Sequence, residues 1–243
     1  MIGIYVKPTI GIGDAIQYTM VPENYFRATG QLLVDTAKHW VFDHNPYVLR
    51  DVTPTKTYDV WNYQNTPKPR ASVYLSLAEK NCGIFGIPVV QKYPRLHAYE
   101  DYPIEKREKI LLHTHGVSHG AMPAHVIEHV LNKYKHLPLY HVGLPTDPDL
   151  GIPKIETPTL WSLAQEISQA RMFIGMDSGP SWIANCYPDI VVKKLRIKPS
   201  VDVFKTWVPL DVNNIHAQWD DRTHLVCNPS EDDVGFTVSY KRL

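Results

Sequence analysis

The chain has 243 residues, of which 44% are hydrophobic and 21% are charged. These fractions are close to those of average globular proteins, which excludes disordered, collagen-like and coiled-coil chains. Because 25 Lys and Arg residues balance 25 Asp and Glu residues, no net charge would attract the whole protein to nucleic acid or to anionic lipid. At this length, one large domain and two small lobes are both compatible with a well-formed core.

The N-terminal residues and the cysteines bear on location. No apolar stretch approaches the roughly 18 residues of a membrane span, and residues 1–7 read as a strand rather than as a signal peptide. The cysteines Cys82, Cys186 and Cys227 are odd in number and lack C-x-x-C spacing. These features predict a cytoplasmic protein whose thiols are packing residues.

The first 30 residues predict a strand, a turn that contains glycine, and a helix. Residues 2–7 carry the strand pattern, and residues 8–14 form the turn. Pro22 should kink or end the first part of the helix, and Gly30 is placed to end the remainder. This order is typical of the first unit of an α/β fold.

Shorter elements follow up to residue 103. Residues 32–34 and 59–61 read as strands, and residues 72–84 read as a helix that Gly83 would end. Residues 86–103 contain three prolines and little periodicity. We therefore place a lobe boundary in this stretch.

The second half of the chain alternates between strand and helix patterns. Strands are predicted at 110–113, 138–143, 172–176 and 190–192. Between them lie a helix with Pro123 at its first position, a helix capped by Thr157 or Thr159, and a helix that begins near Ser178. Such alternation predicts βαβ units with parallel strands and right-handed crossovers. From Lys198 onward the pattern is irregular and assigns no element.

The first candidate site is the turn Gly11-Ile12-Gly13-Asp14 between a strand and a helix. Ligands bind beyond the carboxyl ends of parallel strands, where this turn lies. Gly11 and Gly13 would let the backbone approach a phosphate or an acceptor, and Lys7 precedes them. Asp14 would either cap the helix or present its carboxylate as a general base.

The second candidate site is Asp177-Ser178-Gly179-Pro180, again where a strand becomes a helix. The first turn of a helix exposes backbone N–H groups, and Gly179 has no side chain to block an incoming phosphate. A diphosphate would fit here. The alternative is an ordinary tight turn in which Asp177 or Ser178 only caps the helix.

The third candidate site surrounds His113, His115 and His119. On one strand His113 and His115 would face the same side, but no Cys or acidic residue accompanies them at the spacing of a structural zinc site. We therefore expect no metal here. The alternative is a polar loop that holds the phosphates or sugar of a nucleotide, with these members: Thr114, His115, Gly116 and Ser118.

Three segments together resemble the glycosyltransferase family 9 enzymes, the heptosyltransferase-like proteins of the GT-B fold. The first is the Val6-Lys7 strand that leads to Gly13-Asp14-Ala15-Ile16-Gln17-Tyr18-Thr19. The second is Leu111-Leu112-His113-Thr114, which is followed by Met122-Pro123 and a helix. The third, Phe173-Ile174-Gly175-Met176-Asp177-Ser178-Gly179-Pro180 with Trp182-Ile183-Ala184, is the most specific.

The resemblance implies an α/β, GT-B-like protein whose two Rossmann-like lobes have parallel sheets and a cleft between them. The acceptor lobe would span 1–103, the donor lobe 104–199, and an irregular tail, 200–243, would pack across both. Asp14 would be the general base of an inverting transfer. No metal would be required, because backbone dipoles and any nearby cation would stabilise the departing diphosphate. No cofactor is implied, because the nucleotide-diphospho sugar is a substrate. Its binding residues would be Thr114, His115, Gly116, Ser118, Asp177, Ser178, Gly179 and Pro180.

The chain departs from the family at two positions on the donor side. Ser118-His119-Gly120 stands where members commonly have a lysine, and Trp182 stands where they have a histidine. His115 or His119 could supply the polar contact instead, to a donor other than ADP-heptose. The same departures favour a noncatalytic module that binds a nucleotide or a sugar. A Rossmann-type oxidoreductase is disfavoured, since the dinucleotide fingerprint is incomplete.

The acceptor that the family suggests is a bacterial surface saccharide. The short chain would also suit a viral enzyme that glycosylates hydroxymethylated DNA bases. That alternative calls for a basic, aromatic-lined surface around Asp14. The residues that could supply its positive charge are Lys7, Arg27, Arg50 and Lys56.

Overall fold

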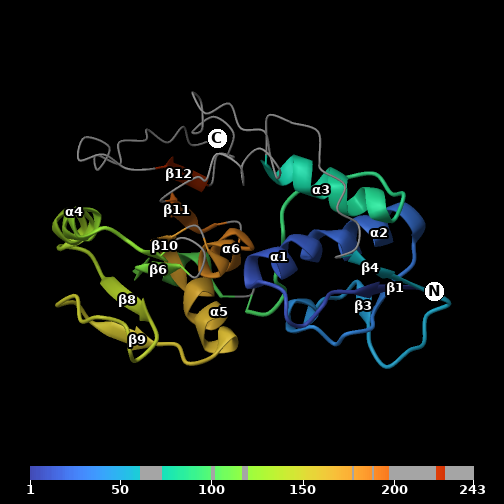
Figure 1. Ribbon diagram of the computed structural model, residues 1–243, viewed down its shortest axis with the longest axis horizontal. Coiled ribbons are helices and arrows are strands. Elements are labelled where there is room, and N and C mark those ends of the chain that lie inside the picture. Colours follow the sequence, from blue (N-terminus) through green and yellow to red (C-terminus); the bar gives the residue numbers. More distant parts are fainter. Residues whose placement is uncertain are drawn as a thin grey trace.

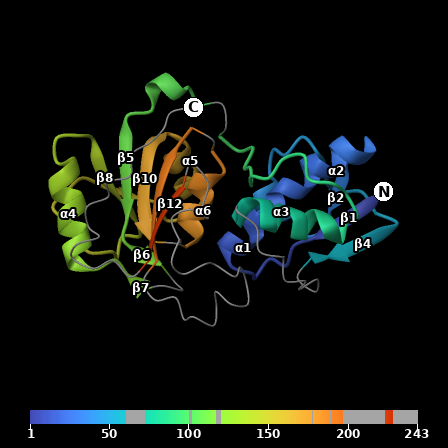
Figure 2. The same cartoon turned by 90° about the horizontal axis from the view of Figure 1, so that it is seen from above.

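The protein consists of two lobes that lie side by side, each built around its own parallel sheet (Figure 1). The computed structural model describes residues 1–60, 73–99, 102–116, 120–176, 178–187, 189–196 and 223–227. Seen from above, the lobes meet where α1 of the N-terminal lobe contacts α6 of the C-terminal lobe (Figure 2). The predicted fold class, two α/β lobes with parallel sheets, is confirmed.

The N-terminal lobe contains a four-stranded parallel sheet in the order β3-β2-β1-β4. Its strands are β1 (Ile2–Tyr5), β2 (Leu33–Asp35), β3 (Val48–Leu49) and β4 (Lys56–Asp59). Its helices are α1 (Ile12–Gln17), α2 (Val21–Thr29) and α3 (Val73–Ile84), with 3-10 turns η1 (Tyr18–Met20) and η2 (Trp40–Phe42). The sequence pattern did not predict β3 and η2, and β4 shares only Asp59 with the strand predicted at 59–61.

One proline and one glycine of this lobe act as predicted, and a second glycine does not. Pro22 lies in the first turn of α2, where a missing amide hydrogen costs nothing because first-turn amides have no partner within the helix. A new helix, separate from α1, therefore begins next to this proline. Gly30 ends α2 in the left-handed conformation with φ of 70°. The prediction for Gly83 is wrong: this residue lies inside α3, and the left-handed glycine after the helix is Gly86.

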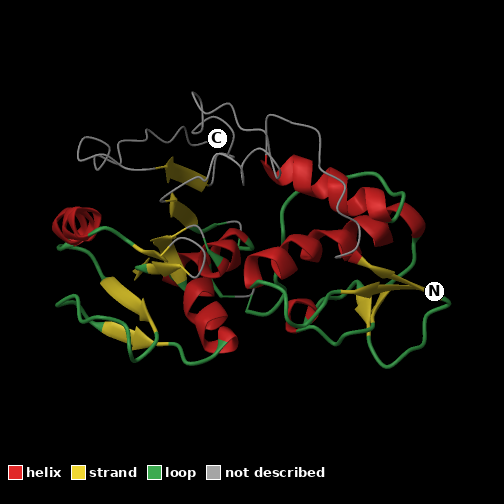
Figure 3. Ribbon diagram, in the orientation of Figure 1, coloured by secondary structure: helices red, strands yellow, loops and turns green. Residues whose placement is uncertain are grey.

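The C-terminal lobe contains a six-stranded parallel sheet in the order β12-β11-β10-β5-β8-β9. This sheet is among the yellow arrows in the left half of Figure 3. Its strands are β5 (Lys109–His113), β8 (Leu139–Gly143), β9 (Lys154–Glu156), β10 (Ala170–Met176), β11 (Val191–Arg196) and β12 (Thr223–Cys227). Its helices are α4 (Ala124–Tyr134), α5 (Leu160–Ser168) and α6 (Gly179–Asn185), preceded by the 3-10 turn η4 (Ile104–Lys106). β12 lies in the part of the chain that the sequence pattern left unassigned.

Side-chain caps fix where two of these helices begin. Thr159 accepts a bond from the Ser162 amide and forms a capping box at the start of α5, so Thr159 and not Thr157 is the cap. Ser178 and Ser181 form the same arrangement at the start of α6. Pro123 is the N-cap of α4, one residue before the predicted position.

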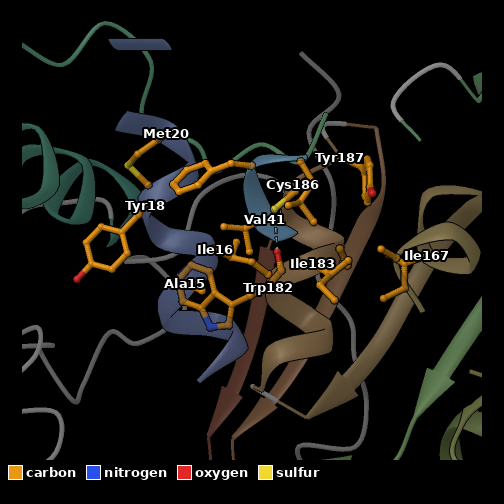
Figure 4. Packing of buried hydrophobic residues seen from close by; sticks show 14 of the residues in the cluster. Ala15, Ile16, Tyr18, Met20, Val41, Ile167, Trp182, Ile183, Cys186 and Tyr187 are labelled. Atoms are coloured by element: carbon orange, nitrogen blue, oxygen red, sulfur yellow. Dashed lines mark hydrogen bonds between the residues drawn. The ribbon is translucent and has the colours of Figure 1, made fainter. Parts of the chain in front are cut away.

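One hydrophobic core crosses from lobe to lobe. It includes Ile4 and Ile16 of the N-terminal lobe together with Phe173 and Ile183 of the C-terminal lobe. Figure 4 shows the middle of this core, where side chains of α1 and α6 pack together.

Among the described residues, no helix is both long and apolar enough to cross a membrane.

The connection between the lobes is held by buried polar side chains. Asn24 of α2 accepts bonds from the amides of Val90 and Gln91 at 2.7 and 2.8 Å, and its amide group donates to the Gln91 carbonyl at 2.7 Å. On the other lobe, the Tyr187 hydroxyl donates to the Ala98 carbonyl at 2.9 Å. The connection is thus attached to both lobes rather than free between them.

Candidate active site

The two glycine turns that the sequence singles out lie against each other. α1 follows β1 and α6 follows β10, so both helices begin at the carboxyl ends of parallel strands. A Cβ atom added to Gly13 would lie 2.8 Å from Cδ1 of Trp182. One added to Gly179 would lie 2.8 Å from Cβ of Ile12. The structure therefore brings the candidate base and the candidate diphosphate turn to one place.

Asp14 is the third residue of α1 and not its cap. Gly11 occupies the N-cap position and no side chain caps the helix, so the interpretation of Asp14 as an N-cap is wrong. A Cβ on Gly11 would lie 2.9 Å from Oδ2 of Asp14, which shows that the carboxylate folds back over the turn. Asp14 keeps its carboxylate beside the turn without a capping role.

Burial raises the pKa of Asp14 because it disfavours the charged carboxylate, and the positive charge of Lys80 on α3 acts against this effect. Burial also lowers the pKa of Lys80, while Asp14 raises it. Burial, with Asp14 and Asp59 as nearby negative charges, raises the pKa of Tyr18 to about 12. Asp14 is thus a partly buried carboxyl with a cation nearby, which suits a general base.

Nothing in the sequence of α3 marks Lys80 as part of this site. Its helix is held against α1 by Asn81, whose amide donates to the Gln17 carbonyl at 3.0 Å. Lys80 comes near Asp14 only because α3 packs on α1, and this packing cannot be read from the local sequence. Sequence reasoning therefore missed Lys80.

The start of α6 is shaped by packing as well as by capping. Ser181 and Trp182 donate their amides to the Ser178 carbonyl at 3.1 and 3.2 Å, and Pro180 has no amide hydrogen. Within the described residues, the Gly179 amide is therefore the one in this turn that these bonds do not use. The side of Gly179 that a larger residue would fill is occupied by Ile12, not by space for phosphate as the sequence suggested. Asp177 lies outside the described residues.

The loop after β5 adjoins the start of α6. β6 (His115–Gly116) pairs with β7 (Gly120–Ala121) in a small antiparallel ribbon. A Cβ on Gly116 would lie 3.1 Å from Met176 and 3.3 Å from Ser178, so these predicted donor residues come together. His115 is exposed, whereas Thr114 is buried. Ser118 and His119 lie outside the described residues.

Thr114 points toward a buried histidine that the sequence did not reveal as part of this region. Its hydroxyl lies 3.4 Å from Nε2 of His141, which is 1% exposed in the middle of β8. Burial lowers the pKa of His141 and lowers that of His113 to about 4. Both imidazoles are therefore neutral near pH 7 and supply no positive charge for a phosphate.

The histidines do not form a shared face. β5 ends at His113 and His115 belongs to β6, so the expectation that both lie on one strand is wrong. Within the ranges that the structure describes, no group of three or more His, Cys, Asp and Glu side chains is placed to hold a metal ion.

Three of the four cations considered for a DNA surface have partners within the protein. Arg27 pairs with Glu23 at 2.7 Å, and Arg50 pairs with Asp35 at 3.3 Å. Lys56 donates to the Tyr58 hydroxyl at 2.9 Å. Lys7 is exposed next to the turn that precedes α1.

Comparison with known proteins rests on structure, since no protein-family model and no curated protein sequence matches the chain. A glycosyl transferase family 9 protein from Veillonella parvula matches with a TM-score of 0.61 and 11% identity, over 99% of this chain and 91% of that one. The E. coli heptosyltransferase WaaC with ADP matches with a TM-score of 0.59 and 10% identity, over 98% and 96%. The chain has the heptosyltransferase fold.

A third similar structure with the heptosyltransferase fold is TibC from enterotoxigenic E. coli, described as an iron-containing dodecameric glycosyltransferase. It matches with a TM-score of 0.56 and 15% identity, over 79% of this chain. The chain spans only 57% of the length of TibC. The described residues here offer no group that fits an iron site.

Proposed function

We propose that this protein is a glycosyltransferase that moves a sugar from a nucleotide-diphospho sugar to an acceptor hydroxyl. The observation that carries the proposal is the position of Asp14: a partly buried carboxyl with a raised pKa, on the helix that packs directly against the start of α6. The heptosyltransferase fold supports the same conclusion.

In the proposed reaction Asp14 is the general base. Its carboxylate takes the proton of the acceptor hydroxyl as the acceptor oxygen attacks the anomeric carbon of the donor. The bond from that carbon to the diphosphate breaks, and the electron pair leaves with the diphosphate. Attack from the opposite face inverts the anomeric carbon. Burial brings the pKa of Asp14 closer to neutral pH, and a carboxylate with a higher pKa is a stronger base.

The donor would lie against the C-terminal lobe. The Gly179 amide at the start of α6 would face the leaving diphosphate, and Gly116 beside Ser178 would let the backbone approach it. His115, Ser118 and Asp177 complete the proposed donor site. Thr114 is buried, so it would act indirectly, by supporting the loop after β5. No divalent metal takes part in this scheme.

The comparisons suggest which donor to test first. WaaC is described with ADP and with ADP-2-deoxy-2-fluoro heptose, and TibC in complex with ADP-D-beta-D-heptose. ADP sugars are therefore the first probes, and other nucleoside diphosphate sugars follow. A saccharide is the acceptor class that we propose, since Arg27, Arg50 and Lys56 are engaged within the protein and leave little support for a DNA acceptor.

The test combines donor binding with sugar transfer. We expect calorimetry in excess chelator to detect binding of a nucleoside diphosphate, and Asp14→Asn to leave its dissociation constant nearly unchanged. Transfer by Asp14→Asn should fall by roughly 10²- to 10⁴-fold, the usual contribution of a positioned general base. Equal transfer by the two proteins would contradict the catalytic role. Donor binding with no transfer to any saccharide would instead indicate a noncatalytic binding module.

A further inference from the structure

We propose that Trp182 is a positioning residue, which locks α1 to α6 and thereby holds Asp14 at a fixed place relative to the donor lobe. The proposal rests on the function proposed above and adds a residue that acts through Asp14. It is carried by two close contacts between the lobes, each of which has a glycine on one side.

The first contact places the indole of Trp182 on the backbone of Gly13. A Cβ on Gly13 would lie 2.8 Å from Cδ1, 3.3 Å from Nε1 and 3.4 Å from Cγ of the indole. Trp182 is only 9% exposed and belongs to the core that both lobes share. Figure 4 shows its side chain reaching from α6 to α1, beside Ala15. Even one methyl group on Gly13 would push the indole away.

The second contact has the same form with the roles of the lobes exchanged. Ile12 of the N-terminal lobe lies over Gly179 of the C-terminal lobe, with Cβ, Cγ2 and Cδ1 at 2.8, 3.2 and 3.3 Å from the place of an added Cβ. Each helix therefore inserts a side chain where the other has a glycine. Two such contacts resist both sliding and rotation of α1 on α6.

The consequence for catalysis follows from the position of Asp14. This residue comes directly after Gly13 in the first turn of α1, so any shift of that turn moves the carboxylate. The diphosphate end of the donor would be placed by α6, the helix that carries Trp182. The contact between Gly13 and Trp182 thus sets the distance between base and leaving group. A displacement of about 1 Å costs a reaction on the order of 10²-fold.

The experiment is a double-mutant cycle of Gly13→Ala and Trp182→Ala. We expect Gly13→Ala to lower kcat on the order of 10²-fold while the KM for donor stays within about 2-fold, because the donor site lies on the other lobe. Trp182→Ala should lower kcat to a similar extent, but the KM criterion applies to Gly13→Ala alone, because Trp182 belongs to the donor-side helix. Trp182→Phe should retain part of the activity. In the Trp182→Ala background, Gly13→Ala should cost little more, because the clash has been removed.

The control is Gly83→Ala, another change of a helical glycine. Gly83 lies in α3 with no atom within 4 Å of an added Cβ, so we expect unchanged kcat. Spin labels attached to keto amino acids that replace Val52 and Leu137 supply a readout besides activity. Both sites are exposed, Val52 between β3 and β4 of one lobe and Leu137 between α4 and β8 of the other. Gly13→Ala should broaden the distance distribution between the labels, and Gly83→Ala should not.

Additive effects of Gly13→Ala and Trp182→Ala on kcat would overturn the proposal. So would a loss of stability in Gly13→Ala with wild-type kcat, which would make the contact structural only. If the wild-type protein transfers no sugar, the proposed function fails. The label distances alone then test whether the contact between Gly13 and Trp182 fixes α1 relative to α6. Unchanged distances in Gly13→Ala would overturn the proposal.

Discussion

The carboxyl of Asp14 makes the folded protein less stable at neutral pH. Burial raises its pKa above the ordinary value of 3.8, and Lys80 opposes this only in part. Between the unfolded and folded pKa values the folded state binds more protons, so the free energy of unfolding falls as the pH rises through this window. The stability contributed by this group is full below the unfolded pKa and is lost above the folded one. Such a cost is typical of a residue retained for function.

We therefore predict that Asp14→Asn gains stability relative to the wild type as the pH rises from about 3 to 7. A capping role would instead leave the stability nearly unchanged, because Asn and Asp cap helices about equally well. Urea denaturation across this pH range measures the difference. Near pH 3, where the wild-type carboxyl is protonated, the two proteins should be about equally stable.

Asp51→Asn is a control with the opposite sign. The hydrogen bond from Lys38 lowers the pKa of the exposed Asp51, so its carboxylate stabilises the fold above the unfolded pKa. Asn also tolerates the left-handed backbone at this position, where φ is 61°. Asp51→Asn should lose stability relative to the wild type as the pH rises. The same pH dependence in both variants would contradict the assignment for Asp14.

At the scale of elements, one side chain of α2 attaches the start of the connection between the lobes to the N-terminal lobe. Asn24 is fully buried and bonds to Val90 and Gln91, and it also donates to the Met20 carbonyl at 2.8 Å. Without the amide, two backbone N–H groups of the connection would lose their acceptor in a partly buried place. Such groups cost about 1–3 kcal/mol each when they stay unpaired.

We predict that Asn24→Ala lowers the free energy of unfolding by about 2 kcal/mol, the low end for two such groups because Val90 is 57% exposed, and that it speeds hydrogen exchange at Val90 and Gln91. Urea denaturation and exchange monitored by NMR would measure these effects. Thr29→Ala is the matched control, because the Thr29 hydroxyl donates to the Tyr25 carbonyl of its own helix at 2.7 Å. Unchanged exchange at Val90 and Gln91 in Asn24→Ala would show that the connection does not depend on this residue.

The sequence predicted elements whose pattern extends over a full helix turn or strand. The helices around Val126 and Leu163 and the strands around Leu111 and Phe173 belong to this group. β3 was missed because a two-residue strand has no measurable alternation. β12 follows a stretch without periodicity, so only its pairing with β11 defines it.

For the site, local signals were sufficient for some residues and not for others. Glycine turns after strands marked Asp14 and Ser178, which the structure brings to neighbouring helices. Lys80 and His141 carry no local signal, because each acts through a contact with another element. The packing of Trp182 on Gly13 joins distant parts of the chain, and a single sequence does not reveal such a contact.

At the scale of the whole molecule, the shared core predicts how the protein unfolds. Chains with two lobes often unfold in separate steps, but here Ile16 of one lobe and Ile183 of the other belong to the same buried cluster. Separating the lobes would expose this surface to water, so neither lobe should be stable without the other. We predict a single calorimetric transition whose van't Hoff and calorimetric enthalpies agree. Gly13→Ala, which disturbs the contact with Trp182, should broaden or split the transition, whereas Gly83→Ala should leave it single. Two resolved transitions in the wild type would mean that the lobes are independent, despite the contacts between α1 and α6.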